Sequence, residues 1–179
     1  MFYATHHPSP VGPLTLASNG RSLVGLWLAG QKYFGGTLPE KPEEKADLPV
    51  FAAARRWLDA YFAGRKPAVA DLPLAPDGSA FRKAVWDILL GIPYGEVVTY
   101  GEIARTLASR TGRASLSGQA VGGAVGHNPI SIVIPCHRVV GTNGSLTGYA
   151  GGIDRKIRLL EHEGVEMSRL FVPGKGTAL

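Results

Sequence analysis

The stretch SGQAVGGAVGHNPISIVIPCHRVV, residues 117–140, joins a glycine-rich helix pattern to the only cysteine of the chain. A helix is predicted over roughly 117–125, although each interior glycine costs a helix about 1 kcal/mol relative to alanine. Glycine permits the close approach of another backbone, which is either a neighbouring helix or a sugar-phosphate chain. Only Gln119 carries a side chain of the kind that reads base edges. The pattern therefore predicts a helix built for proximity rather than for base reading.

A second short helix is predicted just before this stretch. Thr99 is a plausible N-cap for a helix over 100–108, and a loop with Arg110 and Arg113 leads on to the glycine-rich helix. Two short helices joined by a turn are typical of a helix-turn-helix, whose second helix enters a groove of DNA. Packing alone explains many such pairs. A slim second helix favours the minor groove, where readout is sequence-degenerate.

The cysteine lies in the run Pro-Cys-His-Arg, residues 135–138. A free thiol has a pKa of about 8.5 and attacks as the thiolate, which neighbouring cations and a histidine favour. A lone cysteine at the end of a strand is more often an inert, buried thiol. The context of Cys136 favours a reactive sulfur instead.

The composition is that of a globular protein with an excess of basic residues. The chain has 179 residues, 45% of them hydrophobic, and a formal net charge of +5. One cysteine allows no internal disulfide and no zinc site of paired cysteines, so we expect a reducing cytoplasm and no bound metal. No apolar run reaches the roughly 18 residues of a membrane span, and residues 1–10 do not resemble a signal peptide, so we expect neither secretion nor a membrane partner. The charge is compatible with a polyanionic partner but supports one only weakly.

The N-terminal part is predicted to be an antiparallel sheet with one helix. Apolar runs over 13–18 and 22–28 flank Asn19-Gly20, which is the strongest short signal of a β-hairpin. A helical pattern then begins at Pro49 and ends at Gly64, in the C′ position.

Two segments lack periodicity. Residues 35–48 are rich in Pro, Glu and Lys and are predicted to be a mobile surface loop. Residues 66–78 contain three prolines and are predicted to be a linker, after which Ser79 can cap the next helix. We therefore expect two domains, over 1–75 and 76–179.

Five motifs occur together in a fixed order. They are QAVGGA (119–124), NP (128–129), IPCHRVV (134–140), GYAGG (148–152) and LEHEG (160–164). In this combination the chain resembles the O6-alkylguanine-DNA alkyltransferases, whose active-site signature is Pro-Cys-His-Arg-Val. The resemblance covers about residues 80–165 and is weaker across the N-terminal part.

The resemblance implies a mixed α/β (α+β) fold. The expected domains are a small ribonuclease-H-like domain over 1–75 and a winged-helix-type DNA-binding domain, carrying the cysteine, over 76–179. The implied activity is irreversible transfer of an alkyl group from O6-alkylguanine, and less well from O4-alkylthymine, in double-stranded DNA to Cys136. No cofactor is implied. We expect a monomer, and cooperative binding along DNA is left open.

The resemblance also implies catalytic roles. Cys136 would accept the alkyl group, His137 would take the thiol proton through a water, and Glu163 would stabilise the resulting imidazolium. A bridging water is sensible because side chains of adjacent residues rarely bond directly. Tyr100 would protonate or hydrogen-bond the guanine, although a tyrosine in a first helical turn is commonly a packing residue.

The remaining site residues are predicted to bind substrate or DNA, or to support those that do. Asn128 would hold the turn before the cysteine strand through side-chain-to-backbone bonds. Tyr149 would pack on the base, the Ala150 amide would point toward the guanine oxygen, and the carbonyls of Cys136 and Val139 would accept from the guanine amino group. The set is completed by Gln119, Gly122, Gly123 and Arg138.

Gln119 departs from the family pattern. Many members carry an arginine there, which fills the space vacated by the rotated nucleotide. A glutamine can occupy the gap but brings no cation. We hypothesise that one of Arg105, Arg110 and Arg113 supplies compensating phosphate contacts.

Two other functions fit parts of the sequence. A Cys-His hydrolase would use the same pair of residues, but no oxyanion hole or orienting Asn or Asp is evident. A non-catalytic lesion sensor would use the same flipping pocket, but it would not need Cys136.

Overall fold

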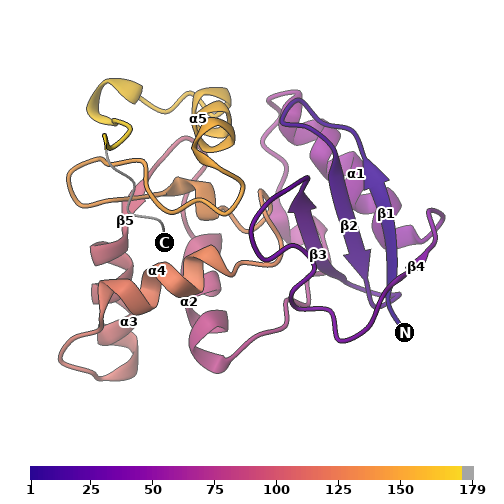
Figure 1. Ribbon diagram of the computed structural model, residues 1–179, viewed down its shortest axis with the longest axis horizontal. Helices are drawn as coiled ribbons and strands as arrows, with labels where there is room; N and C mark the ends of the chain where they lie inside the picture. The colour runs from indigo at the N-terminus through magenta and orange to yellow at the C-terminus, as the bar shows by residue number, and fades with distance from the viewer. Residues whose placement is uncertain (175–179) are drawn as a thin grey trace. The chain divides into compact units, whose positions relative to one another are not determined.

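The predicted hairpin forms one half of a four-stranded sheet in the computed structural model, which describes residues 1–174. The strands are β1 (Tyr3–His7), β2 (Leu14–Ser18), β3 (Leu23–Leu28) and β4 (Glu43–Glu44), in the order β3-β2-β1-β4 (Figure 1). β2 and β3 are antiparallel, as predicted for the hairpin, and β1 pairs antiparallel with β2. At the turn, the Asn19 side chain accepts from the Arg21 and Ser22 amides, while Gly20 has a φ of 95° that glycine adopts without strain.

The prediction of a mobile loop over 35–48 is wrong for its second half. β4 pairs in parallel with β1, and the amides of Glu43 and Lys45 donate to the carbonyls of Phe2 and Ala4. The high proline and charge content concealed a strand of only two residues, which is too short to show an alternating pattern.

Helix α1 (Pro49–Phe62) begins at the predicted proline and packs against β2 and β3. It ends as predicted, with Gly64 in the C′ position at a φ of 76°. The Gly64 amide donates to the Tyr61 carbonyl and the Arg65 amide to the Ala60 carbonyl, which is the Schellman pattern.

The predicted linker over 66–78 is also corrected. It contains a short helix, η1 (Val69–Asp71), and pairs with β3, since the Leu23 amide donates to the Pro73 carbonyl and the Ala75 amide to the Leu23 carbonyl. The chain forms two compact units, one of Met1–Gly78 with Pro129–Val133, and one of Ser79–Asn128 with the described residues from Ile134 onward. The hydrogen bonds of Pro73 and Ala75 to Leu23 therefore make this segment part of the first unit.

The second unit is mostly helical. Its elements are α2 (Ala80–Leu90), β5 (Val98–Thr99), α3 (Tyr100–Thr111), α4 (Gly118–Gly126), η2 (Cys136–Arg138), β6 (Val139–Val140), α5 (Ile153–His162) and η3 (Met167–Arg169) (Figure 1). The predicted caps are present, since the side chains of Ser79 and Thr99 accept from the amides three residues on. Ser117 caps α4 in the same way, which was not predicted. Helix α3 runs three residues past the predicted end because the terminating αL residue is Gly112. None of the helices described has the length and apolar character to cross a membrane.

The segment before the cysteine belongs to the first unit. The Leu26 amide donates to the Pro129 carbonyl, and the Ser131 amide donates to the Leu26 carbonyl. Ile132 has a φ of 71°, which is rare for a β-branched residue, so the strained backbone is held by its surroundings. Cys136 then begins the 3-10 turn η2 rather than lying in a strand as expected, and β6 follows it.

Candidate active site

Cys136 is almost completely buried, with 5% of its surface exposed. Burial raises the pKa of its thiol, while a hydrogen bond from the Asn128 side chain and the charge of Lys156 act in the opposite direction. The net shift is upward, so the resting sulfur is a neutral thiol at physiological pH. The Asn128 hydrogen bond and the Lys156 charge nevertheless favour the thiolate once the thiol proton has been removed.

His137, the next residue, carries an imidazole that is held in a fixed position. Its ring is fully buried, and its Nε2 lies 2.7 Å from Oε1 of Glu163. Its Nδ1 is buried without a hydrogen-bond partner among the described residues. Burial lowers the pKa of the imidazole more than Glu163 raises it, so the resting ring is neutral. With Nε2 donating to the carboxylate, Nδ1 carries the lone pair and can accept a proton.

Glu163 caps the end of α5 and is held from several sides. Arg138 donates to it twice, from Nε to Oε2 at 2.8 Å and from Nη2 to Oε1 at 2.9 Å, and the Gly95 amide donates to Oε2 at 3.2 Å. Burial alone would raise the pKa of Glu163, but the hydrogen bonds from His137 and Arg138 bring it well below its ordinary value. The carboxylate is therefore a fixed anion beside the imidazole.

Arg138 does not lie on the surface where a DNA contact was predicted. Its guanidinium is buried, and besides its two bonds to Glu163 it donates from Nη1 to the Ile92 carbonyl at 2.6 Å. It also lies over the Tyr94 ring, 5.7 Å from the centroid. Arg138 thus fixes the carboxylate from within the protein.

Lys156 is a site residue that the sequence analysis missed. It is fully buried in α5, and its Nζ donates to the carbonyls of Val139 and Thr147. Burial lowers its pKa to about 8. The signal was available, because Lys156 precedes Leu159 and Leu160 by three and four residues and so lies on the buried face of the helix.

One of the predicted base-contacting residues, Tyr100, bonds to a carbonyl that Lys156 also engages. The Tyr100 hydroxyl donates to the Thr147 carbonyl at 2.9 Å, and burial raises the pKa of this phenol, so it remains a donor. The Tyr149 ring is buried, and its hydroxyl has no hydrogen-bond partner in the part of the chain that the structure describes. Ala150 follows it and is half-buried.

Asn128 makes the expected side-chain-to-backbone bond. Its Nδ2 donates to the Ile134 carbonyl at 2.7 Å, across the segment that precedes the cysteine. The same side chain lowers the thiol pKa, so its contribution reaches Cys136 directly. Val139 contributes its carbonyl, which Lys156 already engages.

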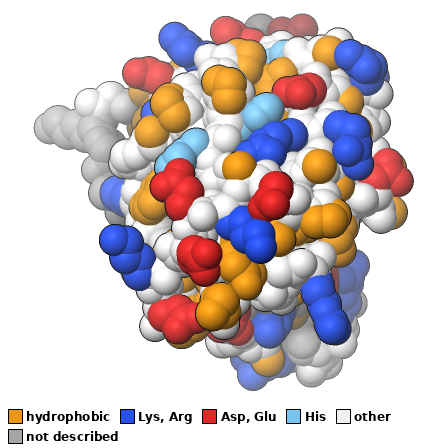
Figure 2. Space-filling view, turned by 90° about the vertical axis from the view of Figure 1, so that its right-hand side faces the viewer, with side chains coloured by type: hydrophobic (Ala, Val, Ile, Leu, Met, Phe, Trp, Pro, Cys, Tyr) orange, Lys and Arg blue, Asp and Glu red, His pale blue; other side chains and the backbone are white. Residues whose placement is uncertain are grey.

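Helix α4 carries the predicted DNA-facing residues. Gln119 is exposed, Gly122 is buried, and Gly123 is half-buried. A Cβ added at Gly118, Gly123 or Gly126 would meet nothing within 4 Å. The protein's own packing therefore does not require glycine at these three positions. On the face shown in Figure 2, positive and negative side chains are intermixed.

Comparison with known proteins agrees with this geometry. Residues 80–165 match the family model for the DNA binding domain of 6-O-methylguanine DNA methyltransferase, and residues 1–76 match its ribonuclease-like domain. The chain is 45% identical over 165 residues to the methylated-DNA–protein-cysteine methyltransferase of Methanosarcina acetivorans, covering 92% of this chain and 99% of that protein. It is 42% identical over 161 residues to the Haemophilus influenzae protein of the same name, covering 90% and 86%.

Solved structures give the same result. The crystal structure of Mycobacterium tuberculosis OGT in complex with DNA matches with a TM-score of 0.77 and 43% identity, over 94% of each chain. The two family models together span both units, and the match over residues 80–165 includes Cys136, His137 and Glu163. The chain belongs to the 6-O-methylguanine DNA methyltransferase family.

Proposed function

We propose that this protein repairs O6-alkylguanine in double-stranded DNA by moving the alkyl group to Sγ of Cys136, and that it treats O4-alkylthymine in the same way but less well. The bond between Sγ and the alkyl carbon forms as the bond between that carbon and O6 breaks. The guanine leaves with the bonding electrons and takes up a proton. The sulfur ends as a thioether, which no other described group can reduce or displace, so each molecule reacts once.

His137 and Glu163 supply the base. The unpartnered Nδ1 of His137 takes the thiol proton through a bridging water, and the imidazolium formed is stabilised by Glu163 at 2.7 Å. Arg138 keeps the carboxylate ionised and oriented. Because the resting thiol and imidazole are both neutral, the charge separates only when substrate is in place.

Tyr100 and the loop after it receive the base. The Tyr100 hydroxyl donates to the guanine, which makes the guanine a better leaving group. The unpartnered Tyr149 hydroxyl and the Ala150 amide lie on the adjoining loop, where they contact the rotated base and its O6. The carbonyls of Cys136 and Val139 accept from its amino group.

DNA reaches the site along α4. The target atom lies inside the duplex, so its nucleotide must rotate out of the stack. The open space around Gly118, Gly123 and Gly126 supports close approach of a sugar-phosphate backbone to this helix. Gln119, with Gly122 behind it, enters the vacated space in the duplex.

The observation that carries the proposal is the buried pair of His137 and Glu163 next to the only cysteine, with Nδ1 of the histidine unpartnered. The test is intact-mass measurement after incubation with a duplex containing O6-methylguanine. We expect every molecule to gain the mass of one methylene unit, localised to Cys136, with no second turnover. Cys136→Ser is the matched control and should gain nothing.

The two alternatives give different results in the same experiment. A lesion sensor would bind the modified duplex in preference to an unmodified one and gain no mass. A hydrolase would turn over repeatedly on an acyl substrate. We further propose that the protein works as a monomer in the cytoplasm, where the lone thiol stays reduced; sedimentation of the free protein checks the oligomeric state.

A further inference from the structure

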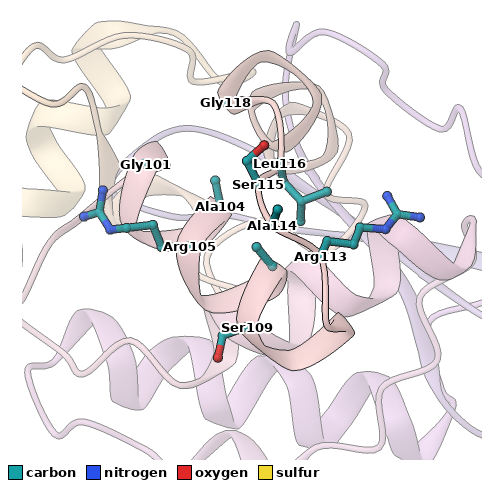
Figure 3. Close-up of a pocket in the computed structure, with 10 residues that line it drawn as sticks. Gly101, Ala104, Arg105, Ser109, Arg113, Ala114, Ser115, Leu116 and Gly118 are labelled. Atoms are coloured by element: carbon teal, nitrogen blue, oxygen red, sulfur yellow. The ribbon is translucent and has the colours of Figure 1, made fainter.

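A cavity of about 470 Å³ lies between α3 and the loop that leads to α4. Its apolar lining includes Ala104 and Ala108 of α3 and Leu116 of the loop, and its polar lining includes Ser115. Gly118, the first residue of α4, is part of the wall (Figure 3). The cavity therefore borders the helix that the proposed function brings against DNA, yet it contains none of the residues assigned to catalysis.

Two arginines line this cavity. Figure 3 shows the guanidinium groups of Arg105 and Arg113 extending to opposite sides of it. Both side chains are exposed, and neither has a hydrogen bond or an ion pair to any residue in 1–174. No acidic residue lines the cavity. Two uncompensated positive charges thus flank a small, mostly apolar surface.

We propose that this cavity, called the groove from here on, holds the sugar-phosphate backbone of one DNA strand. Arg105 and Arg113 each contact a phosphate, and a deoxyribose between those phosphates packs on Ala104, Ala108 and Leu116. The two guanidinium groups extend to opposite sides of the cavity in Figure 3, which favours one phosphate at each arginine over a single anion held between them.

The groove also explains how DNA can be bound although Gln119, near the start of α4, is neutral. Gln119 follows Gly118 directly and brings no cation, so the charge that holds the strand comes from the groove beside it. Of the three arginines singled out in the sequence, Arg105 and Arg113 line the cavity and Arg110 does not. The proposal rests on the DNA-repair function above and assigns its strand contact.

The test measures binding to an unmodified duplex as a function of salt concentration. Each phosphate contact contributes about 0.9 to the slope of log K against log salt, so Arg105→Ala and Arg113→Ala should each lower the slope by about 1, and the double variant by about 2. Arg110→Ala is the control: it removes one positive charge from α3, the helix that carries Arg105, at a position that does not line the groove. This variant should change the slope much less. Ser115→Glu should weaken binding roughly tenfold, whereas Ser115→Gln should not.

Two outcomes overturn the proposal. One is an unchanged slope in the double variant, and the other is a change in Arg110→Ala as large as in Arg113→Ala, which would indicate only a diffuse basic field. Transfer from free O6-methylguanine base separates this failure from failure of the repair function. If only the proposal about the groove is wrong, the wild-type protein still gains a methyl group from the free base. If the repair function is wrong, the protein gains no methyl group from the free base or from the duplex.

Discussion

Lys156 and Tyr100 donate to the same acceptor, the carbonyl of Thr147, each at 2.9 Å. Lys156 also donates to the Val139 carbonyl, and its charge lowers the pKa of Cys136. One buried ammonium therefore fixes the loop that is proposed to receive the guanine and favours the thiolate that is proposed to attack it.

Lys156→Met should slow alkyl transfer from duplex DNA by about tenfold, because the positive charge that lowers the pKa of the Cys136 thiol is lost. The measurement is the single-turnover rate as a function of pH, in which the rising limb should move to higher pH. Arg158→Met removes a charge from the exposed side of the same helix and is the control. Equal effects of the two substitutions would show that only the net charge matters.

Lys156 should also shape the pH dependence of stability. Its pKa falls from 10.5 in the unfolded chain to about 8 in the folded protein, so the unfolded state binds more protons between these values. The penalty from this residue is full below pH 8 and is relieved as the pH rises toward 10.5. The free energy of unfolding of the wild type, relative to Lys156→Met, should therefore increase over that range in urea titrations. A difference that stays constant with pH would contradict the shift.

The local signals of the sequence were reliable because their physics is local. Ser79 and Thr99 cap helices through bonds to amides three residues away, and Gly64 ends α1 because glycine tolerates the left-handed conformation there. Such choices depend on neighbouring residues only, so a short window of sequence contains all the necessary information.

The features that the sequence did not predict depend on contacts between residues that are distant in sequence. Arg138 follows the cysteine and histidine in sequence, but its direction is set by Glu163 and the Ile92 carbonyl, 25 and 46 residues away. The strand β4 exists only because β1 offers it a partner. The groove that Arg105 and Arg113 flank likewise depends on how the loop folds back on α3, which no periodicity encodes.

Glu163→Gln should destabilise the protein by about 3 kcal/mol, because it leaves the buried guanidinium of Arg138 without its anion. The double variant with Arg138→Met should be less destabilised than the sum of the two single variants, since the second change removes the orphaned charge. Urea denaturation of the four proteins completes the cycle. Additive effects would mean that the two side chains do not act as a pair.

Tyr100→Phe should separate chemistry from stability. Loss of the bond to the Thr147 carbonyl costs only about 1 kcal/mol of stability, because the ring still fills its buried site. Loss of the donor to the leaving guanine should lower the transfer rate by about 10²-fold while leaving DNA affinity nearly unchanged. Rates and affinities measured on the same duplex decide this; a fall in affinity alone would assign Tyr100 to binding.

Gly123→Ala should make the protein more stable and a poorer DNA binder. The added Cβ meets nothing within 4 Å and lies in the interior of α4, so helix propensity predicts a gain of about 1 kcal/mol in the free energy of unfolding. A methyl group on the face that approaches DNA should in contrast weaken duplex binding and slow transfer from duplex DNA, with no matching loss in transfer from the free base. Gly144→Ala is the opposite case, since its Cβ would collide with the Arg169 carbonyl and its φ is 88°, and it should destabilise the fold. If Gly123→Ala were more stable and bound DNA as well as the wild type, close approach of DNA could not be the reason for the glycine, and the slim helix would need another explanation.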